Sequence, residues 1–338
     1  MKKILISLLA VVLAFTCVFS FAACTKDNPP ADGSGNAEVK FALPDGTPVL
    51  SAVNFMANKP ELKNSDGADY DIRINIVPAA NIGQTVSSGQ ADFAVMPTVA
   101  AASLYNKGGD VQLVSTNVFG NLYVAGLNGL SSESDLENLK GKVVYVTGAT
   151  TISLFKYILT QNGINCKDGS TATEGMVTLF AKSEASEIIP LLKQAETKST
   201  EAYAVLGEPQ LTQAQGKISS LGVIFDLQEE WKNITGFDGY PQASLIVKKS
   251  FADSNPQLVE AVAELFRNNE SYLENNLSSL ADVLSENGST IAELTFTATT
   301  IERCNLIHKS AAEIKASVKD YIKRLSNIDL DDNFFYGA

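Results

Sequence analysis

Histidine and cysteine, on which most metal sites and many catalytic sites depend, are scarce in this sequence. It contains one histidine, His308, and four cysteines that are not grouped with it. A zinc site therefore has almost no ligands to draw on, and a Ser-His-Asp or Cys-His catalytic site would rely on His308 alone. We expect no metal, no cofactor and no catalytic residue, and interpret His308 as a packed or solvated residue of a late helix.

Basic residues are also few. The chain carries 26 Lys and Arg against 38 Asp and Glu, a formal net charge of −12, and shows no basic stripe. Nucleic-acid binding is not expected, because it requires clustered positive charge. The hydrophobic fraction of 45% is that of a globular protein. The length exceeds the usual size of a single core, so we expect a monomer with two lobes.

Two of the cysteines, Cys166 and Cys304, lie far apart in the body of the chain. They can pair in an oxidising compartment. Isolated cysteines without motif spacing are more often small buried hydrophobic residues. The sequence leaves both alternatives open and favours the second.

The N-terminal segment reads as an export signal. Met1-Lys2-Lys3 precedes an apolar run over 4–21, and Ala22-Ala23-Cys24 follows. The last residues resemble the lipobox of bacterial lipoproteins, with Phe21 in place of the usual aliphatic residue. The resemblance implies a signal peptide over 1–23, a lipid on Cys24 and a flexible Pro/Gly/Ser-rich tether over 24–38. The alternative is an ordinary secretory signal with a chance cysteine.

A lipid anchor also agrees with the charge of the body. Cleavage before Cys24 removes Lys2 and Lys3 and leaves 24 basic against 38 acidic residues, a net charge of −14. An acidic body is repelled by an anionic membrane, so the lipid must provide the anchoring while the body stays in solvent.

Short apolar runs alternate with helical patterns after the tether, which predicts an α/β fold with parallel sheets and helices on both faces. The expected strands are 39–43, 70–77, 92–96, 111–116, 122–125, 142–146, 176–181, 202–206, 223–225 and 243–247. The expected helices are 49–58, 99–106, 148–162, 185–195, 210–215, 258–273, 277–286 and 300–325, with a helical turn at 135–139. Two α/β rounds and a helical return predict two doubly wound lobes with a cleft between them. The first comprises 39–124 plus 238–338, the second 125–237.

Four motifs follow one another along the chain: the G-x-x-D strand start at 89–95, the L-K-G-K-x-V-x-V run at 139–146, the strand and E-P turn at 202–209, and the return crossing at 239–247 with its following helix. In this order and spacing they resemble type II periplasmic binding proteins, in particular the nitrate/sulfonate/taurine and thiamine-precursor subgroup. The resemblance covers most of 39–275. It implies a solute-binding protein that works with an ABC permease and its ATPase.

Ligands of open α/β sheets bind outside the carboxyl ends of the strands. Here those ends are 44–48, 96–98, 115–119, 147–151 and 207–208, none of which contains Arg or Lys. The candidate ligand contacts are in these loops and in the return crossing: Asp45, Thr47, Thr98, Asn117, Phe119, Thr147, Thr150, Thr151, Glu208 and Tyr240.

Each candidate also has a purely structural interpretation. The hydroxyl-rich loop at 147–151 offers N–H groups and hydroxyls to an anion or carbonyl, or is a plain N-cap. Asp45 meets a ligand amine or closes an Asx-turn. Glu208 selects a cation or caps the next helix. The aromatic residues near the crossings either stack on a planar ring or pack the core: Phe119, Tyr123, Phe237 and Tyr240.

Together these features favour a neutral or cationic heteroaromatic or amphiphilic solute, captured outside the cytoplasm and delivered to an importer. One alternative is a ligand-sensing partner of a membrane signalling protein. Another is an enzyme resembling those that make the thiamine pyrimidine on the same fold. Their active-site histidine and Cys-rich iron motif have no counterpart here.

Overall fold

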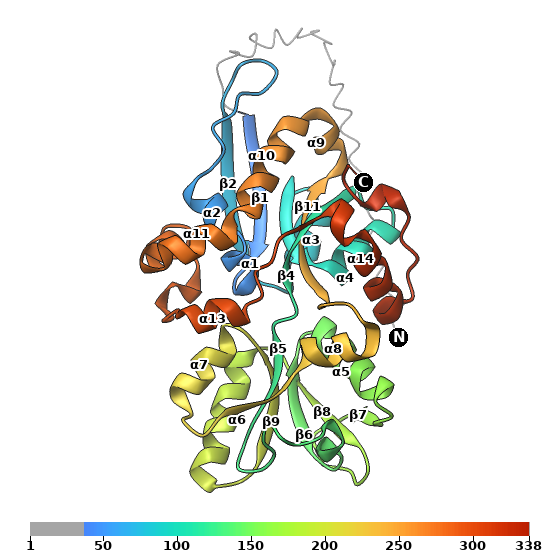
Figure 1. The fold of residues 1–338 in the computed structure, drawn as a ribbon. Coiled ribbons are helices and arrows are strands. Elements are labelled where there is room, and N and C mark those ends of the chain that lie inside the picture. The colour runs from blue at the N-terminus through green and yellow to red at the C-terminus, as the bar shows by residue number, and fades with distance from the viewer. Residues whose placement is uncertain (1–36, 338) are drawn as a thin grey trace, which may run out of the picture. The chain divides into compact units, whose positions relative to one another are not determined.

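The computed structural model describes residues 37–337 (Figure 1). The predicted signal peptide, Cys24 and the tether as far as residue 36 lie outside the described residues. The tether prediction was wrong for its last two residues, because Ala37 and Glu38 already pair with the neighbouring strand. In the described part of the chain, no helix has the length and apolar character needed to cross a membrane.

Sheet 1 has six strands and contains the N-terminal strand. Its order is β12 (Lys309–Ser310), β4 (Val111–Phe119), β11 (Pro241–Lys248), β3 (Phe93–Pro97), β1 (Ala37–Pro44) and β2 (Tyr70–Val77). The strands β1, β2 and β3 are parallel, whereas β11 is antiparallel to both of its neighbours.

Sheet 2 also has six strands and is formed by the middle of the chain. Its order is β10 (Gly222–Asp226), β5 (Leu122–Leu127), β9 (Ala202–Gly207), β6 (Val143–Thr147), β8 (Val177–Lys182) and β7 (Cys166–Asp168). Here β5 is antiparallel to β9 and β10, and the other pairs are parallel.

The α/β class and the two doubly wound sheets agree with the prediction from the sequence, but each sheet is mixed rather than wholly parallel. The exceptions are β12, which pairs antiparallel with β4 at the edge of sheet 1, and β5 and β11, the strands by which the chain enters sheet 2 and returns to sheet 1. A strand that starts at the edge where its neighbours end must run in the opposite direction. The two crossings therefore account for the antiparallel pairs of β5 and β11.

Helices cover the sheets. Those before the return crossing are α1 (Thr47–Leu50), α2 (Val53–Ala57), α3 (Ile82–Ser87), α4 (Thr98–Asn106), α5 (Ala149–Gln161), α6 (Ala185–Lys198), α7 (Gln210–Lys217) and α8 (Leu227–Thr235). Those after it are α9 (Lys249–Ser254), α10 (Pro256–Arg267), α11 (Asn269–Asn276), α12 (Leu280–Glu286), α13 (Ala298–Arg303) and α14 (Ala311–Ser326). Single 3-10 turns lie at Leu136–Leu139, Leu277–Ser279, Thr290–Glu293 and Asp332–Phe334.

Three predicted helices are interrupted, and in two of them a side-chain hydrogen bond lies at the break. The Ser51 hydroxyl donates to Pro48 O, at the break between α1 and α2. The buried Asn269 side chain bonds to Leu50 O and to the Asn54 N–H, at the break between α10 and α11. The predicted helix over 300–325 is α13, the short strand β12 and α14.

The correction to the predicted helix over 300–325 also changes the position assigned to His308. His308 lies in the segment between α13 and β12, so its assignment to a helix was wrong. Cys304 and Leu306 of this segment are buried in the core, and β12 pairs with the edge of β4. A new helix then starts at Ser310, whose side chain and that of Glu313 form a capping box.

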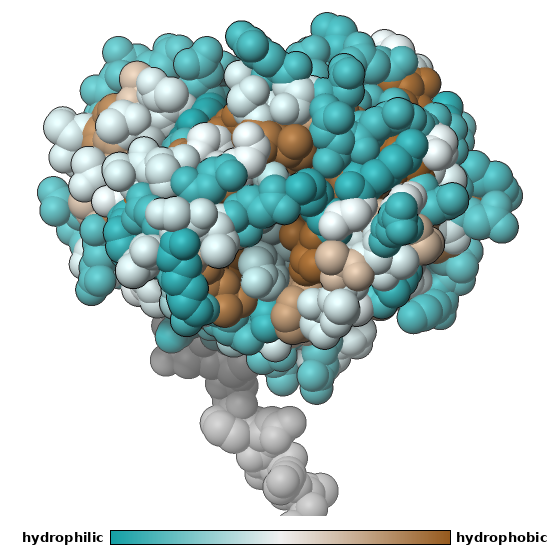
Figure 2. All heavy atoms as spheres, turned by 90° about the horizontal axis from the view of Figure 1, so that it is seen from below, coloured by the Kyte–Doolittle hydropathy of each residue, from teal (hydrophilic) through white to brown (hydrophobic). Residues whose placement is uncertain are grey.

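One hydrophobic cluster extends across both sheets. It includes Phe119 and Tyr321 on the sheet 1 side and Leu122 and Trp231 on the sheet 2 side. Cys166 and Cys304 are free thiols. The end of the body seen in Figure 2 is mostly hydrophilic, with apolar residues in separate small patches.

Candidate functional site: the junction between the two sheets

The strand directions bring the carboxyl ends of both sheets to one junction. In sheet 1, β1 and β3 run in parallel with Phe41 opposite Phe93, so both end at the same edge. In sheet 2, β6 and β9 run in parallel with Tyr145 opposite Ala204. The residue after β9 contacts the residue that starts α1, as described next, so the two edges face one another. This is the arrangement in which α/β sheets bind ligands.

Thr47 and Glu208, both predicted site residues, are in direct contact across the junction. The Thr47 hydroxyl donates to Glu208 O at 2.6 Å, and Asn121 Nδ2 donates to the Thr47 hydroxyl at 2.7 Å. All three residues are buried. Asn121 lies between β4 and β5, where the chain crosses between the sheets, so this network ties the crossing to both sheets.

The Glu208 side chain forms an ion pair with Arg303 from α13. Its other carboxylate oxygen accepts from the Thr212 N–H in the first turn of α7 at 3.1 Å. Glu208 thus caps a helix, which is one of its two predicted roles, while its charge is also balanced by Arg303. The carboxylate side chain is fully buried and Arg303 is 25% exposed.

Arg303 holds a second group of contacts across the junction. Its guanidinium donates to the Thr212 hydroxyl at 2.9 Å and to Gln215 Oε1 at 3.1 Å, both on α7. The Thr212 hydroxyl also donates to the Thr300 hydroxyl of α13 at 3.3 Å. Helix α13, which follows β11 of sheet 1 in the chain, is therefore bound to α7, which follows β9 of sheet 2.

The Asp45 side chain does not reach across the junction but bonds to residues on the sheet 1 side. Its carboxylate accepts from the Ser289 hydroxyl at 2.5 Å and from the N–H and hydroxyl of Thr290 at 2.8 and 2.6 Å. It also accepts from the Gly46 N–H at 3.1 Å. These contacts join the loop after β1 to the 3-10 turn Thr290–Glu293, and they occupy both carboxylate oxygens.

The loop at the start of α5 has unpaired hydroxyls. Thr147, Thr150 and Thr151 are all partly exposed, and within residues 37–337 none of their hydroxyls forms a hydrogen bond. Gly148 precedes the helix with a φ of 74° and has no side chain to cap it. The first N–H groups of α5 thus lack a capping side chain from the N-cap position. Helix and hydroxyls together offer donors to an acceptor group at the junction edge of sheet 2.

Thr98, the first residue of α4, and Asn117 of β4 are both buried. The Thr98 hydroxyl is 2.8 Å from the Ser244 hydroxyl, and the Thr116 hydroxyl is 3.0 Å from it. Asn117 Oδ1 is 2.9 Å from His308 Nδ1. Burial lowers the pKa of His308 to about 4, with nearby Arg267 and Lys309 acting in the same direction and Glu313 and Glu264 opposing.

The aromatic candidates pack in the core. Tyr240 is fully buried, with its ring centroid 6.0 Å from those of Trp231 and Tyr321. Burial raises its pKa well above the usual value. Phe119 is also buried, and its N–H donates to Asn305 O at 3.0 Å. Both support the crossings between the sheets.

Solved structures with the same fold include proteins of ABC transport systems. An ABC transporter protein from Parabacteroides distasonis superposes with a TM-score of 0.68 at 23% identity, over 89% of this chain and 99% of that one. The ligand-binding component of an ABC-type import system from Staphylococcus aureus, with zinc bound, has a TM-score of 0.60 at 11% identity, over 89% and 96%. The periplasmic aliphatic sulphonate binding protein of Escherichia coli has a TM-score of 0.60 at 12% identity, over 88% and 97%.

The chain has the fold of ABC-import substrate-binding proteins. No family model and no curated protein matches its sequence. In the described part of this substrate-binding fold, no three His, Cys, Asp or Glu residues are grouped so as to hold a metal ion.

Arg303, Asn121 and Thr212 are junction residues that sequence reasoning missed. Arg303 and Thr212 lie inside helices, away from the strand ends on which the prediction relied. The E-P turn at Glu208 was the one signal nearby, but it does not reveal which cation approaches it. Only the packing of α13 on α7 supplies that partner.

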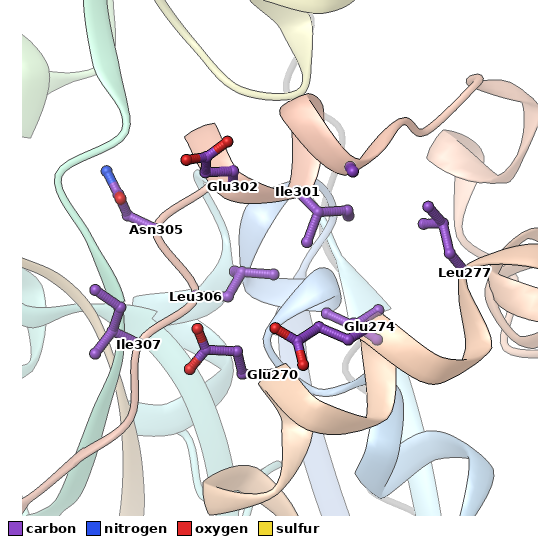
Figure 3. Close-up of a pocket in the computed structure, with 10 residues that line it drawn as sticks. Glu270, Glu274, Leu277, Ile301, Glu302, Asn305, Leu306 and Ile307 are labelled. Atoms are coloured by element: carbon purple, nitrogen blue, oxygen red, sulfur yellow. The ribbon is translucent and has the colours of Figure 1, made fainter.

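A pocket of about 540 Å³ lies beside the junction, on the side of sheet 1 (Figure 3). It is formed by α11, α13 and the segment that follows α13. Asn305 of this segment lines the pocket and also donates to Gly120 O in the first crossing. No predicted site residue lines this pocket.

Proposed function

We propose that this protein is the extracytoplasmic substrate-binding component of an ABC importer, which captures a small solute between its two sheets. The observation that carries the proposal is that the carboxyl ends of both sheets meet at a junction tied by polar contacts from both sides. The chain passes between the sheets twice there, before β5 and before β11. Such a double connection allows hinge closure around a ligand. Such a role needs no catalytic group.

We further propose that the solute presents an oxyanion or a carbonyl oxygen to the start of α5. The support is the set of unpaired hydroxyls of Thr147, Thr150 and Thr151 beside an uncapped helix start. Thr47 and Glu208 stay candidates for the facing wall in an open form, in which the cross-junction contacts separate. Asp45 also stays a candidate, but its carboxylate would have to leave Ser289 and Thr290 on its own side.

A cationic or heteroaromatic solute has less support than the sequence alone gave it. In this arrangement the charge of Glu208 is already balanced by Arg303, which weakens the case for a cation bound to this carboxylate. Phe119, Tyr123 and Tyr240 are buried in the core. The acceptor-bearing solute is therefore the stronger proposal.

The proposal also includes export and a lipid on Cys24, after which the body would remain close to the membrane and to an importer. The supporting observations are the lipobox-like sequence and the acidic composition. An ABC permease and its ATPase are the partners that such a component serves.

A thermal-shift screen tests the solute class. Small sulfonates, carboxylates, amides and ammonium compounds of matched size are added to the protein, and a specific ligand at a hundred times its Kd stabilises it by about 2.7 kcal/mol. We expect the acceptor-bearing compounds to raise the melting temperature. Stabilisation by the ammonium compounds alone would show that the proposed solute class is wrong.

The double substitution Thr150→Ala with Thr151→Ala then tests the site. Loss of two hydrogen bonds of about 1 kcal/mol each weakens binding of the stabilising compound by roughly thirtyfold. Thr160→Ala is the matched control, because this hydroxyl lies in the last turn of the same helix and donates to Lys156 O. Equal affinities in the double variant and the control would show that the loop only starts the helix and does not contact the solute.

A further inference from the structure

The pocket between α11 and α13 combines an apolar wall with acidic side chains. Its volume of about 540 Å³ lies within the range of small-molecule sites. The apolar residues come from α11, α13, the turn after α11 and the segment after α13: Leu273, Leu277, Ile301, Leu306 and Ile307. Ile307 is 38% exposed and is the large hydrophobic residue left open to solvent in the described part of the chain.

Three carboxylates surround this wall. Glu270 and Glu274 are one helical turn apart on α11, and Glu302 belongs to α13. Figure 3 shows the side chains of Glu270 and Glu274 extending from α11 toward the segment that carries Leu306, with Glu302 at the opposite rim. Among residues 37–337 none of the three forms a salt bridge, although acidic residues elsewhere on the body do so repeatedly.

We propose that this pocket binds a small organic cation, an ammonium or guanidinium group attached to an apolar moiety. The apolar wall accepts the hydrocarbon part, because its burial removes apolar surface from water. Glu270 and Glu274 accept charge-assisted hydrogen bonds from the cationic head. An anionic ligand is excluded by the same charges.

The pocket is separate from the proposed solute site. It uses no strand end of sheet 2, and its lining comes from the chain after β11. Two of its walls lead to the junction: Asn305 contacts Phe119 and Gly120 of the first crossing, and α13 also carries Arg303. A cation bound here thus lies against a segment that is bonded to the hinge. The inference stands whether or not the junction binds an acceptor-bearing solute.

Calorimetric titration of the full-length chain with hexylammonium, hexanol and hexanoate tests the proposal, because the three probes share one apolar part. We expect hexylammonium to bind, hexanol to bind at least about tenfold more weakly, and hexanoate not to bind. Hexylammonium binding should weaken with rising salt, since exposed carboxylates are screened. Equal binding of all three probes, or displacement of hexylammonium by magnesium at constant ionic strength, would overturn the proposal.

Two variants separate charge from volume. Glu270→Gln with Glu274→Gln removes the charges at exposed positions and should weaken hexylammonium binding at least about tenfold. The matched control is Glu286→Gln with Glu293→Gln, exposed acidic residues that do not line the pocket, and it should bind as the wild type does. Equal affinities of the two double variants would overturn the proposal.

Ala298→Phe fills the pocket from the exposed start of α13 and keeps every carboxylate. It should abolish hexylammonium binding while leaving the thermal unfolding transition in place. Unchanged binding in this variant contradicts the assignment to the pocket. Loss of hexylammonium binding in the Thr150→Ala, Thr151→Ala variant would instead place the cation at the junction and overturn this inference alone.

Discussion

Glu208 and Arg303 form a buried ion pair that connects the two sheets. Glu208 follows β9 of sheet 2, and Arg303 ends α13 on the sheet 1 side. The guanidinium also bonds to two side chains of α7, so a single residue joins the helix to the carboxylate that caps it. The pair therefore couples the contact across the junction to the stability of the whole body.

Arg303→Met should lower the free energy of unfolding by about 3 kcal/mol, because it leaves the Glu208 charge buried without a partner. The value is at the low end of the usual range, since Arg303 is partly exposed. Urea denaturation measures it. Lys63→Met is the control, because it breaks an exposed pair with Asp69 and should cost less than about 1 kcal/mol.

Adding Glu208→Gln to Arg303→Met should restore part of the lost stability, because the neutral amide needs no counter-charge. This double-mutant comparison isolates the charge interaction from the packing of the two side chains. A loss for Arg303→Met no larger than that of the Lys63 control would contradict the buried pair.

Gly120→Ala should destabilise the protein by about 1–3 kcal/mol through overpacking. A Cβ at this position would lie 2.4 Å from Cε1 of Tyr240 and 2.5 Å from Oε1 of Gln228. The crossing between β4 and β5 thus approaches the return crossing so closely that only a glycine fits. Thermal or urea unfolding measures the effect.

Gly216→Ala provides the matched control for that substitution. Gly216 lies within α7, and no atom lies within 4 Å of an added Cβ. The change should stabilise the protein by about 0.5–1 kcal/mol, because alanine is the better helix former. If the two alanine variants unfold at the same denaturant concentration, the close approach of the crossings is wrong.

Stability should fall on acidification in part through His308. Burial lowers its pKa to about 4 from 6.5. A depressed histidine pKa means that the unfolded chain binds the proton more tightly, so stability is full above about pH 6.5 and is lost as the pH falls toward 4. Because the ring is partly screened by solvent, we expect a contribution of at most about 2 kcal/mol.

His308→Gln removes this titration and is the reference for it. The stability difference between wild type and variant should change between pH 7 and 4.5, with the wild type losing more. Since the sequence has one histidine, an NMR titration of the imidazole reports its pKa directly. A measured pKa at or above 6.5 would refute the buried neutral ring.

Expression in a bacterium with a lipoprotein pathway should yield a mature chain that starts at Cys24 with acyl groups attached. Stable anchoring requires at least two lipid chains, and mass spectrometry of the N-terminal peptide detects them. Cys17→Ser is the control and should leave the modification intact, because this residue lies within the predicted signal peptide. Cleavage at another bond with an unmodified Cys24 would exclude the anchor.

Periodic elements could be predicted from the sequence because their pattern is local. The alternation of Ile72, Ile74 and Ile76 predicts β2, which spans Tyr70–Val77 as expected. The position of the carboxyl ends also follows from the strand–helix alternation. The helix break at Asn269 was missed, because it depends on a side chain that bonds to backbone far away in the chain. The break at Ser51 was also missed, although the hydroxyl there bonds to Pro48 O within the same turn.

By itself the sequence determined the α/β class, most strands and the loops at their carboxyl ends, since hydrophobic period and turn residues act over a few positions. The tertiary structure decided which partners meet there. It gave Glu208 a counter-charge from Arg303 and turned Asp45 toward Ser289 and Thr290. Within residues 37–337 it left the hydroxyls of Thr147, Thr150 and Thr151 without a hydrogen bond. Such pairings join residues far apart in the chain, and only the packing of the two sheets brings them within bonding distance.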